Sequence, residues 1–159
     1  LTFDILKGKF PKYSIQNNSF NKSGIAEGEL VGGNLALIYA LLGTKYSFDF
    51  KDKILFIEDI GEKFYALDRM IMSLELAGVF RKIKGLIVGG MTLMEDEKEN
   101  MNYEESFDEF SYKLIAERIS KYDFPVIFGF PNGHIYDNRP LIIGAKISMA
   151  VGKKVEVKF

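Results

Sequence analysis

The sequence contains no cysteine and only one histidine, His134. Without cysteine there is no disulfide framework, no cysteine nucleophile and no thiolate metal site, and a lone histidine makes an imidazole-based metal site unfavourable too. The absence of cysteine is compatible with a cytoplasmic location. Histidine is the one side chain that exchanges protons near neutral pH without tuning, so His134 is the first candidate for acid–base chemistry.

Strong charge of one sign and long apolar runs are also absent. The formal net charge is −1, so no basic field points to nucleic acid or to an anionic membrane. Apolar runs stop well short of the ~20 residues of a membrane span, and the start has no signal-peptide pattern. The chain opens on Leu1 rather than methionine, and we expect it to be part of a longer protein. Its 159 residues suffice for one domain, and 47% hydrophobic residues argue against disorder.

The first third of the chain predicts one strand and one helix. Residues 1–22 are polar and are expected to form a linker or an edge segment. Residues 25–31 predict a short strand. The apolar run 35–42 predicts a helix with Asn34 as N-cap and Gly43 just past its end. Because this run is almost entirely apolar, we expect the helix to be buried on most sides.

The remaining segments alternate between strands and helices. Strands are expected at 54–57, 86–88, 125–128, 145–151 and 155–159, the last two as a hairpin, and helices at 62–77 and after the capping box that begins at Ser106. On the second of these helices we expect Phe107, Phe110 and Leu114 to share a face. The acidic stretch 92–105 is expected to be a solvated loop, with weak binding of a hard cation as a less favoured alternative. This order predicts an α/β fold with a mixed, partly parallel sheet and flanking helices.

Two acidic residues, Glu58 and Asp59, follow the strand 54–57, and His134 follows the strand 125–128. In open α/β sheets ligands collect beyond the carboxyl ends of the strands, so parallel neighbours would bring Glu58 and His134 to one rim. A carboxylate that accepts a hydrogen bond from an imidazole fixes its tautomer, as in a Ser–His–acid triad. Successive strand residues point to opposite faces, so only one of the two acids can reach the histidine. The alternative is a solvated strand end whose acids cap the next helix.

The nucleophile of such a triad is missing, since no Gly-x-Ser-x-Gly elbow occurs and no serine sits in a strand-to-helix turn. The segment 32–34, Gly-Gly-Asn, could bind an anion at a helix N-terminus, but close backbone approach with an N-cap is the favoured interpretation. From its residues, the chain supplies at most a base and the group that orients it.

An ordered set of segments resembles the C-terminal half of the LD-carboxypeptidase family, the serine peptidases that include muramoyl-tetrapeptide carboxypeptidase and the microcin-immunity peptidases. The segments are Val31-Gly-Gly-Asn-Leu35, Leu42-Gly-Thr-Lys-Tyr46, Ile54-Leu-Phe-Ile-Glu-Asp59, Asp68-Arg-Met70, Leu76-Ala-Gly78, Gly85-Leu-Ile-Val-Gly89 and Gly133-His134. The resemblance covers residues 24–150.

The resemblance implies a domain of the swivelling β/β/α type over 23–159, preceded by a 1–22 linker or edge segment from an absent N-terminal domain. The catalytic glutamate and histidine of the family fall on Glu58 and His134, while the nucleophilic serine and oxyanion hole lie on that N-terminal domain. The family removes a terminal D-alanine from cytoplasmic murein tetrapeptides, or cuts related amides, without metal or cofactor. Its members are commonly homodimers.

The resemblance leaves several readings open. In the leading hypothesis the chain is the base-carrying part of an enzyme and is inactive without the serine domain. The alternative is a non-catalytic binding module that kept the fold, and a transferase using the same triad ranks lower. The acidic stretch 92–105 is longer than the resemblance leads us to expect, which would alter substrate entry or the dimer surface.

Overall fold

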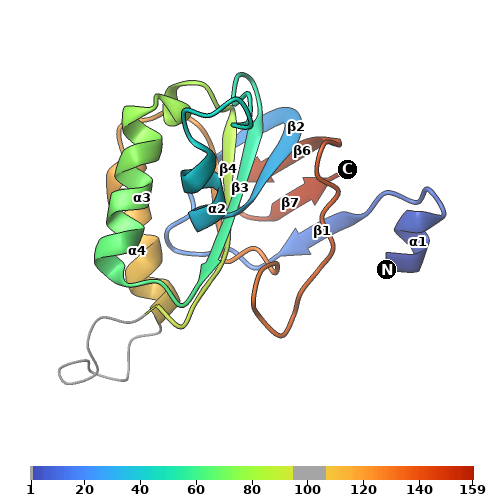
Figure 1. The fold of residues 1–159 in the computed structure, drawn as a ribbon. Coiled ribbons are helices and arrows are strands. Elements are labelled where there is room, and N and C mark those ends of the chain that lie inside the picture. The colour runs from blue at the N-terminus through green and yellow to red at the C-terminus, as the bar shows by residue number, and fades with distance from the viewer. Residues whose placement is uncertain (1, 95–106) are drawn as a thin grey trace.

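The fold was examined in a computed structural model that describes residues 2–94 and 107–159 (Figure 1). In order, the elements are α1 (Thr2–Leu6), β1 (Lys12–Ile15), β2 (Gly24–Asn34), α2 (Leu35–Leu41), β3 (Ile54–Ile60), α3 (Phe64–Leu76), the 3-10 turn η1 (Val79–Arg81), β4 (Gly85–Thr92), α4 (Phe107–Ile119), β5 (Val126–Phe128), β6 (Lys146–Val151) and β7 (Val155–Lys158).

The strands form one seven-stranded sheet in the order β1-β7-β6-β2-β3-β4-β5. Strand β2 joins its two halves. Residues 24–29 of β2 pair antiparallel with β6, whereas residues 30–34 pair in parallel with β3. From β2 to β5 the strands run parallel, and from β2 through β6 and β7 to β1 they run antiparallel. The mixed, partly parallel sheet predicted from the sequence is therefore confirmed.

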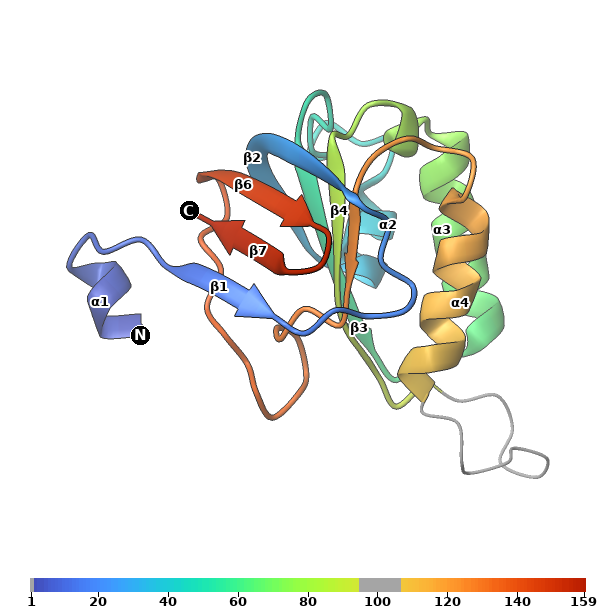
Figure 2. The ribbon, with the colours of Figure 1, turned by 180° about the vertical axis from the view of Figure 1, so that it is seen from behind.

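Three layers build the domain. Helices α2, α3 and α4 cover one face of the parallel strands, and the antiparallel strands β1, β6 and β7 lie against the other face (Figures 1 and 2). Strands β3 and β4 are buried on both faces, as interior parallel strands are, except for the last residue of each. Their side chains are apolar apart from Glu58 and Asp59 near the end of β3 and the terminal Thr92 of β4. Two apolar cores result, one on each side of the sheet, in the β/β/α layering that the resemblance implies.

Several predicted elements are confirmed in detail. The Asn34 side chain accepts a hydrogen bond from the Leu37 N–H and so caps α2, as expected. Helix α3 buries Phe64, Leu67 and Leu74, and the chain leaves it through Gly78, which has the left-handed φ of 74°. Strands β6 and β7 form the predicted hairpin.

The prediction that α2 is buried on most sides is wrong. Only Leu35 and Ile38 are buried on this helix, while Leu37 is 66% exposed and Tyr39 is also exposed. The helix packs against the sheet with one side only, so the apolar residues on its outer side remain exposed although the sequence is apolar throughout.

The buried face of α4 also differs from the predicted one. Tyr112, Ile115 and Ile119 enter the core, whereas Phe110 is 42% exposed and Leu114 is only partly buried. Neither the predicted capping-box residue Ser106 nor the side chain of Phe107 lies within the described part, and most of the acidic stretch 92–105 also falls outside it.

The first 22 residues contain more regular structure than the polar sequence suggested. Strand β1 pairs with β7 at one edge of the sheet, and Lys22 forms a bridge to Val126 at the opposite edge. Helix α1 projects from the body and buries no residue (Figure 1). Among the described residues, no helix combines the length and apolarity that crossing a membrane demands.

Candidate active site

Glu58 and His134 meet at the carboxyl ends of the parallel strands. The Nδ1 atom of His134 lies 2.9 Å from Oε2 of Glu58, across 76 residues of sequence. The Glu58 side chain is 9% exposed and the His134 side chain 53% exposed, so the acid is enclosed and the imidazole reaches solvent. An ionised carboxylate can only accept, so the shared proton belongs to Nδ1, and Nε2 is left available to a second group.

Strand alternation separates Glu58 from its neighbour Asp59. The Asp59 carboxylate faces α2, where it accepts hydrogen bonds from the Asn34 side-chain amide at 2.9 Å and the Ala36 backbone N–H at 3.1 Å. It therefore helps to cap α2, the helix that precedes it in the chain. The alternative in which this acidic pair caps the following helix is wrong, because the N-cap position of α3 is Lys63 and no side chain makes a cap hydrogen bond there.

Burial dominates the electrostatics of Asp59, which is 1% exposed. Desolvation raises the pKa of this carboxyl above its ordinary value of 3.8, and the three hydrogen bonds that it accepts only partly offset that effect. The nearby charge of Glu58 raises the pKa of Asp59 further. Asp59 is thus a structural acid whose charge is costly to keep in place.

Two glycines on β4 make room for the loop that carries His134. The β3–β4 register shifts at Glu58, which alone lies opposite both Gly89 and Gly90 of β4. The Gly90 N–H donates to the Asn132 carbonyl oxygen at 3.0 Å, which holds the loop on the strand. A Cβ at Gly89 would overlap that same carbonyl, and one at Gly90 would lie 2.5 Å from the Ile135 side chain.

The loop is also braced within itself. Asn132 donates through its side chain to the Arg139 carbonyl oxygen at 2.6 Å, and the Arg139 N–H donates to the Pro131 carbonyl oxygen at 2.8 Å. Gly133 has φ 120°, and a Cβ there would approach Glu58 Oε2 to 3.0 Å. Glycine at this position lets the backbone pass beside the carboxylate with the turn that presents His134.

A pocket of ≈ 400 Å³ opens over the pair. Its lining consists of the ends of β2 and β3 and of the loop after β5: Gly32, Gly33, Phe56, Glu58, Asn132, Gly133, His134, Asn138, Leu141 and Ile143. The pocket therefore offers an imidazole and a carboxylate beside two amides and an apolar wall. Sequence patterns gave no reason to single out Asn132, Asn138, Leu141 or Ile143, because they lie in a loop without periodicity.

Gly32 and Gly33 take part through their backbones. A Cβ at Gly32 would overlap the Phe56 carbonyl oxygen, so β2 and β3 approach closely only because this side chain is missing. Together with the Asn34 cap, this close approach confirms the favoured interpretation of the Gly-Gly-Asn segment.

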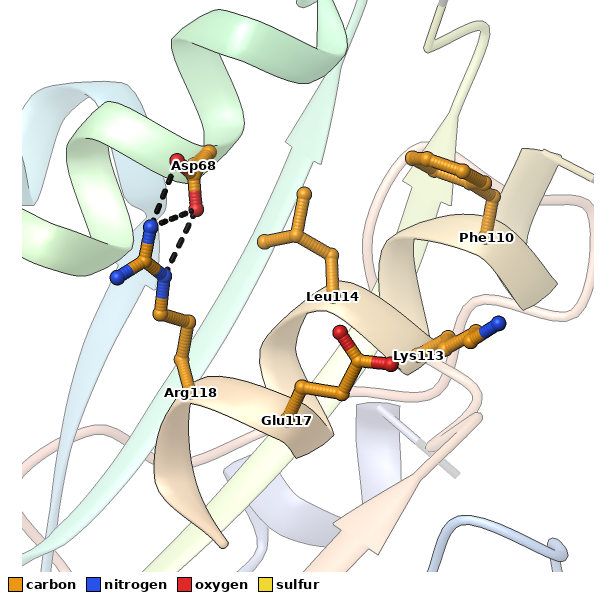
Figure 3. Close-up of a pocket in the computed structure, with 6 residues that line it drawn as sticks. All are labelled: Asp68, Phe110, Lys113, Leu114, Glu117 and Arg118. Carbon is orange, nitrogen blue, oxygen red and sulfur yellow. Dashed lines mark hydrogen bonds and ion pairs between the residues drawn. The ribbon is translucent and has the colours of Figure 1, made fainter.

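A second pocket, of ≈ 490 Å³, lies away from this site between α3 and α4 (Figure 3). Arg118 reaches across from α4 and makes two parallel hydrogen bonds to Asp68 on α3, at 2.9 and 2.8 Å. The Arg118 guanidinium is already paired with Asp68, and the lining of this pocket contains no histidine. Among residues 2–94 and 107–159, no group of three or more metal-binding side chains forms a metal site.

Comparison with known proteins places this chain in a family. The model of the LD-carboxypeptidase C-terminal domain matches residues 27–149. The probable murein peptide carboxypeptidase of Bacillus subtilis is 35% identical over 136 residues, which cover 84% of this chain and 40% of that protein. The microcin C7 self-immunity protein MccF of Escherichia coli is 27% identical over 146 residues, covering 91% and 40%.

Solved structures agree. The muramoyltetrapeptide carboxypeptidase of Oxalobacter formigenes superposes with a TM-score of 0.79 at 27% identity, over 98% of this chain and 52% of that one. The chain thus spans about half or less of the length of these relatives. It belongs to the LD-carboxypeptidase family, as the C-terminal domain of that family.

Proposed function

We propose that this chain supplies the general base and its orienting acid to a serine-type LD-carboxypeptidase, and that a preceding domain supplies the nucleophilic serine. The observation that carries the proposal is the 2.9 Å contact between His134 Nδ1 and Glu58 Oε2 on the wall of an open pocket. A buried carboxylate on one nitrogen and an unoccupied second nitrogen are what a triad base requires.

In the proposed reaction, Nε2 of His134 takes the serine hydroxyl proton while the serine oxygen bonds to the carbonyl carbon of the scissile amide. The imidazolium then gives this proton to the amide nitrogen as the carbon–nitrogen bond breaks. Water repeats the sequence on the acyl-enzyme and restores the serine. Glu58 holds the imidazole in the Nδ1–H tautomer and stabilises its charged form. No step needs a metal or a cofactor.

The substrate we propose is a murein tetrapeptide, from which the enzyme releases the terminal D-alanine in the cytoplasm. Murein chemistry is favoured over microcin chemistry because the relative named as a murein peptide carboxypeptidase is 35% identical to this chain and the microcin-immunity protein 27%. The preceding serine domain and a second copy in a homodimer are the proposed partners. The 159-residue chain alone should be inactive, because its own serines include no candidate nucleophile.

The test uses the product of the complete gene and measures D-alanine release from the tetrapeptide. We expect H134A to lower kcat by about 10⁶-fold and E58Q by about 10⁴-fold, as for triad members elsewhere. D68N, in the remote pocket of Figure 3, is the matched control and should turn over normally. Near-normal turnover by H134A, or turnover by the 159-residue chain alone, contradicts the proposal and favours a non-catalytic module or a different base.

A further inference from the structure

Tyr13 contacts the His134 loop at both of its ends. Its hydroxyl donates to the carbonyl oxygen of Pro140, which follows the loop, at 2.6 Å. Its ring meets that of Phe130, which precedes the loop, edge-on at a centroid distance of 5.6 Å and an angle of 81°. One side chain on β1 thus contacts both Phe130 and Pro140, the residues between which the loop carries His134 away from the core. Figure 2 shows β1 beside this part of the chain.

Tyr13 is itself firmly held. It is 3% exposed, and its backbone pairs with Val157 of β7. Its ring also packs edge-on against Phe159, at 6.1 Å and 89°. Burial raises the pKa of the Tyr13 hydroxyl above 10.0, with the Arg139 charge acting in the opposite direction, so the hydroxyl remains a protonated donor at neutral pH. The anchor is a fixed, neutral hydrogen-bond donor.

The backbone hydrogen bonds of the loop fix other parts of it. The first half of the loop is fixed on β4 by the hydrogen bond from Gly90 to Asn132. The two halves are joined by the bonds from Asn132 to Arg139 and from Arg139 to Pro131. After Arg139, the next backbone bond to the sheet comes from Gly144 to Leu30. Between these positions, the Tyr13 hydroxyl supplies the hydrogen bond between the returning segment and the core, and Leu141 packs against the same core.

We propose that Tyr13 is a positioning residue for His134: by holding Phe130 and Pro140 at a fixed separation, it sets where the imidazole lies relative to Glu58. Its effect on turnover rests on the function proposed above. Tyr13 lies before residues 27–149, the stretch that matches the family's domain model. The proposed positioning residue therefore lies outside the stretch that the domain model matches.

The first test reads the imidazole directly in the 159-residue chain. Because His134 is the only histidine, its ring nitrogens give a single set of NMR signals, which report the fraction of neutral imidazole protonated on Nδ1. E58Q defines the value without the carboxylate. We expect Y13F, which removes only the hydroxyl, to move this fraction toward the E58Q value. F130L, which trims the other contact, should move it in the same direction.

Y122F is the matched control. Tyr122 also packs between aromatic rings, those of Phe80 and Phe124, and its hydroxyl lies 3.5 Å from Glu75, but it is remote from His134. It should leave the tautomer fraction unchanged. Wild-type fractions in both Y13F and F130L, or an equal shift in Y122F, overturn the proposal. F130L decides the matter if Y13F does not fold.

The second test uses the complete gene product. Y13F should lower kcat about 10-fold and leave KM within about twofold, because a base displaced by a fraction of an ångström weakens the chemical step more than binding. A merely structural role would lower the yield of folded enzyme and leave kcat per folded molecule intact, which contradicts the proposal. If the wild-type enzyme releases no D-alanine, the proposed function fails, and the imidazole measurement still decides the role of Tyr13.

Discussion

The adjacent residues Glu58 and Asp59 direct their carboxylates to opposite faces of β3, one to His134 at 2.9 Å and the other to the start of α2. Period-two alternation of a strand thus separates a chemical role from a structural one within a single dipeptide. Substitutions of the two residues should separate in the same way.

D59N should destabilise the chain, whereas E58Q should have a smaller effect. The two carboxylate oxygens of Asp59 accept hydrogen bonds from the Asn34 side chain and the Ala36 N–H. In D59N the side-chain NH₂ group replaces one of these oxygens, so it faces another N–H donor and that hydrogen bond is lost. We expect a loss of about 1–3 kcal/mol in the free energy of unfolding for D59N. Urea unfolding of the two variants and the wild type measures this difference. A larger loss for E58Q than for D59N would contradict the assignment.

The effect of Asp59 should depend on pH in one direction. Its pKa is raised in the folded state, so between pH 3.8 and the folded value the folded chain binds more protons than the unfolded chain. Stability from this group is therefore lost as pH rises through that interval, and it is constant above it. The stability advantage of wild type over D59N should shrink from pH 3 to neutral pH. Urea titrations across this range measure it, and an advantage that grows with pH would mean a lowered pKa.

G89A should disturb both the fold and the candidate site. A Cβ there meets the backbone carbonyl of Asn132, which cannot move without the histidine loop, and the strand backbone itself is unstrained. We expect a loss of about 1–3 kcal/mol from overpacking, together with a change in the His134 NMR signals. G152A, whose Cβ would enter open space in the β6–β7 turn, is the control. Unchanged His134 signals in G89A would show that the loop does not depend on this contact.

Neighbouring residues of α2 should respond very differently to truncation. Ile38 is 3% exposed and Leu37 is 66% exposed. I38A should cost about 2–5 kcal/mol through transfer and cavity terms. L37Q should stay within about 0.5 kcal/mol, as for other surface changes. Thermal unfolding of both variants gives the comparison. An equal loss would mean that Leu37 is covered in solution.

The sequence predicted most of the fold because its strands are short apolar runs between clear breaks. Asn34 and Gly78 mark a helix start and a helix end by side-chain and backbone chemistry that depends on few neighbours. The predicted buried face of α4 was wrong. Phe110 and Tyr112 are both aromatic, and Tyr112 is the buried one because its ring packs against Phe128 and its hydroxyl bonds to the Gly89 carbonyl oxygen.

For the site, the acid and the histidine could be named in advance, and the structure brings them together, while their catalytic role stays a prediction. The surroundings could not be named. The fit of Gly89 and Gly90 to the loop, and the reach of Tyr13 to Pro140, are contacts between segments distant in sequence. No local pattern of residues encodes such a contact, so only the folded chain reveals it.

Strand β1 pairs only with β7, so the two ends of the chain share one edge of the sheet, and the Phe159 N–H donates to the Pro11 carbonyl oxygen. Tyr13 comes 142 residues before the start of β7 in the chain, so its partner strand is made long after it. Under the role proposed for Tyr13, the final geometry around His134 waits for β7, although the histidine pocket is lined by β2, β3 and the loop after β5 rather than by β7. Deleting β7 should loosen the histidine loop as effectively as removing β1.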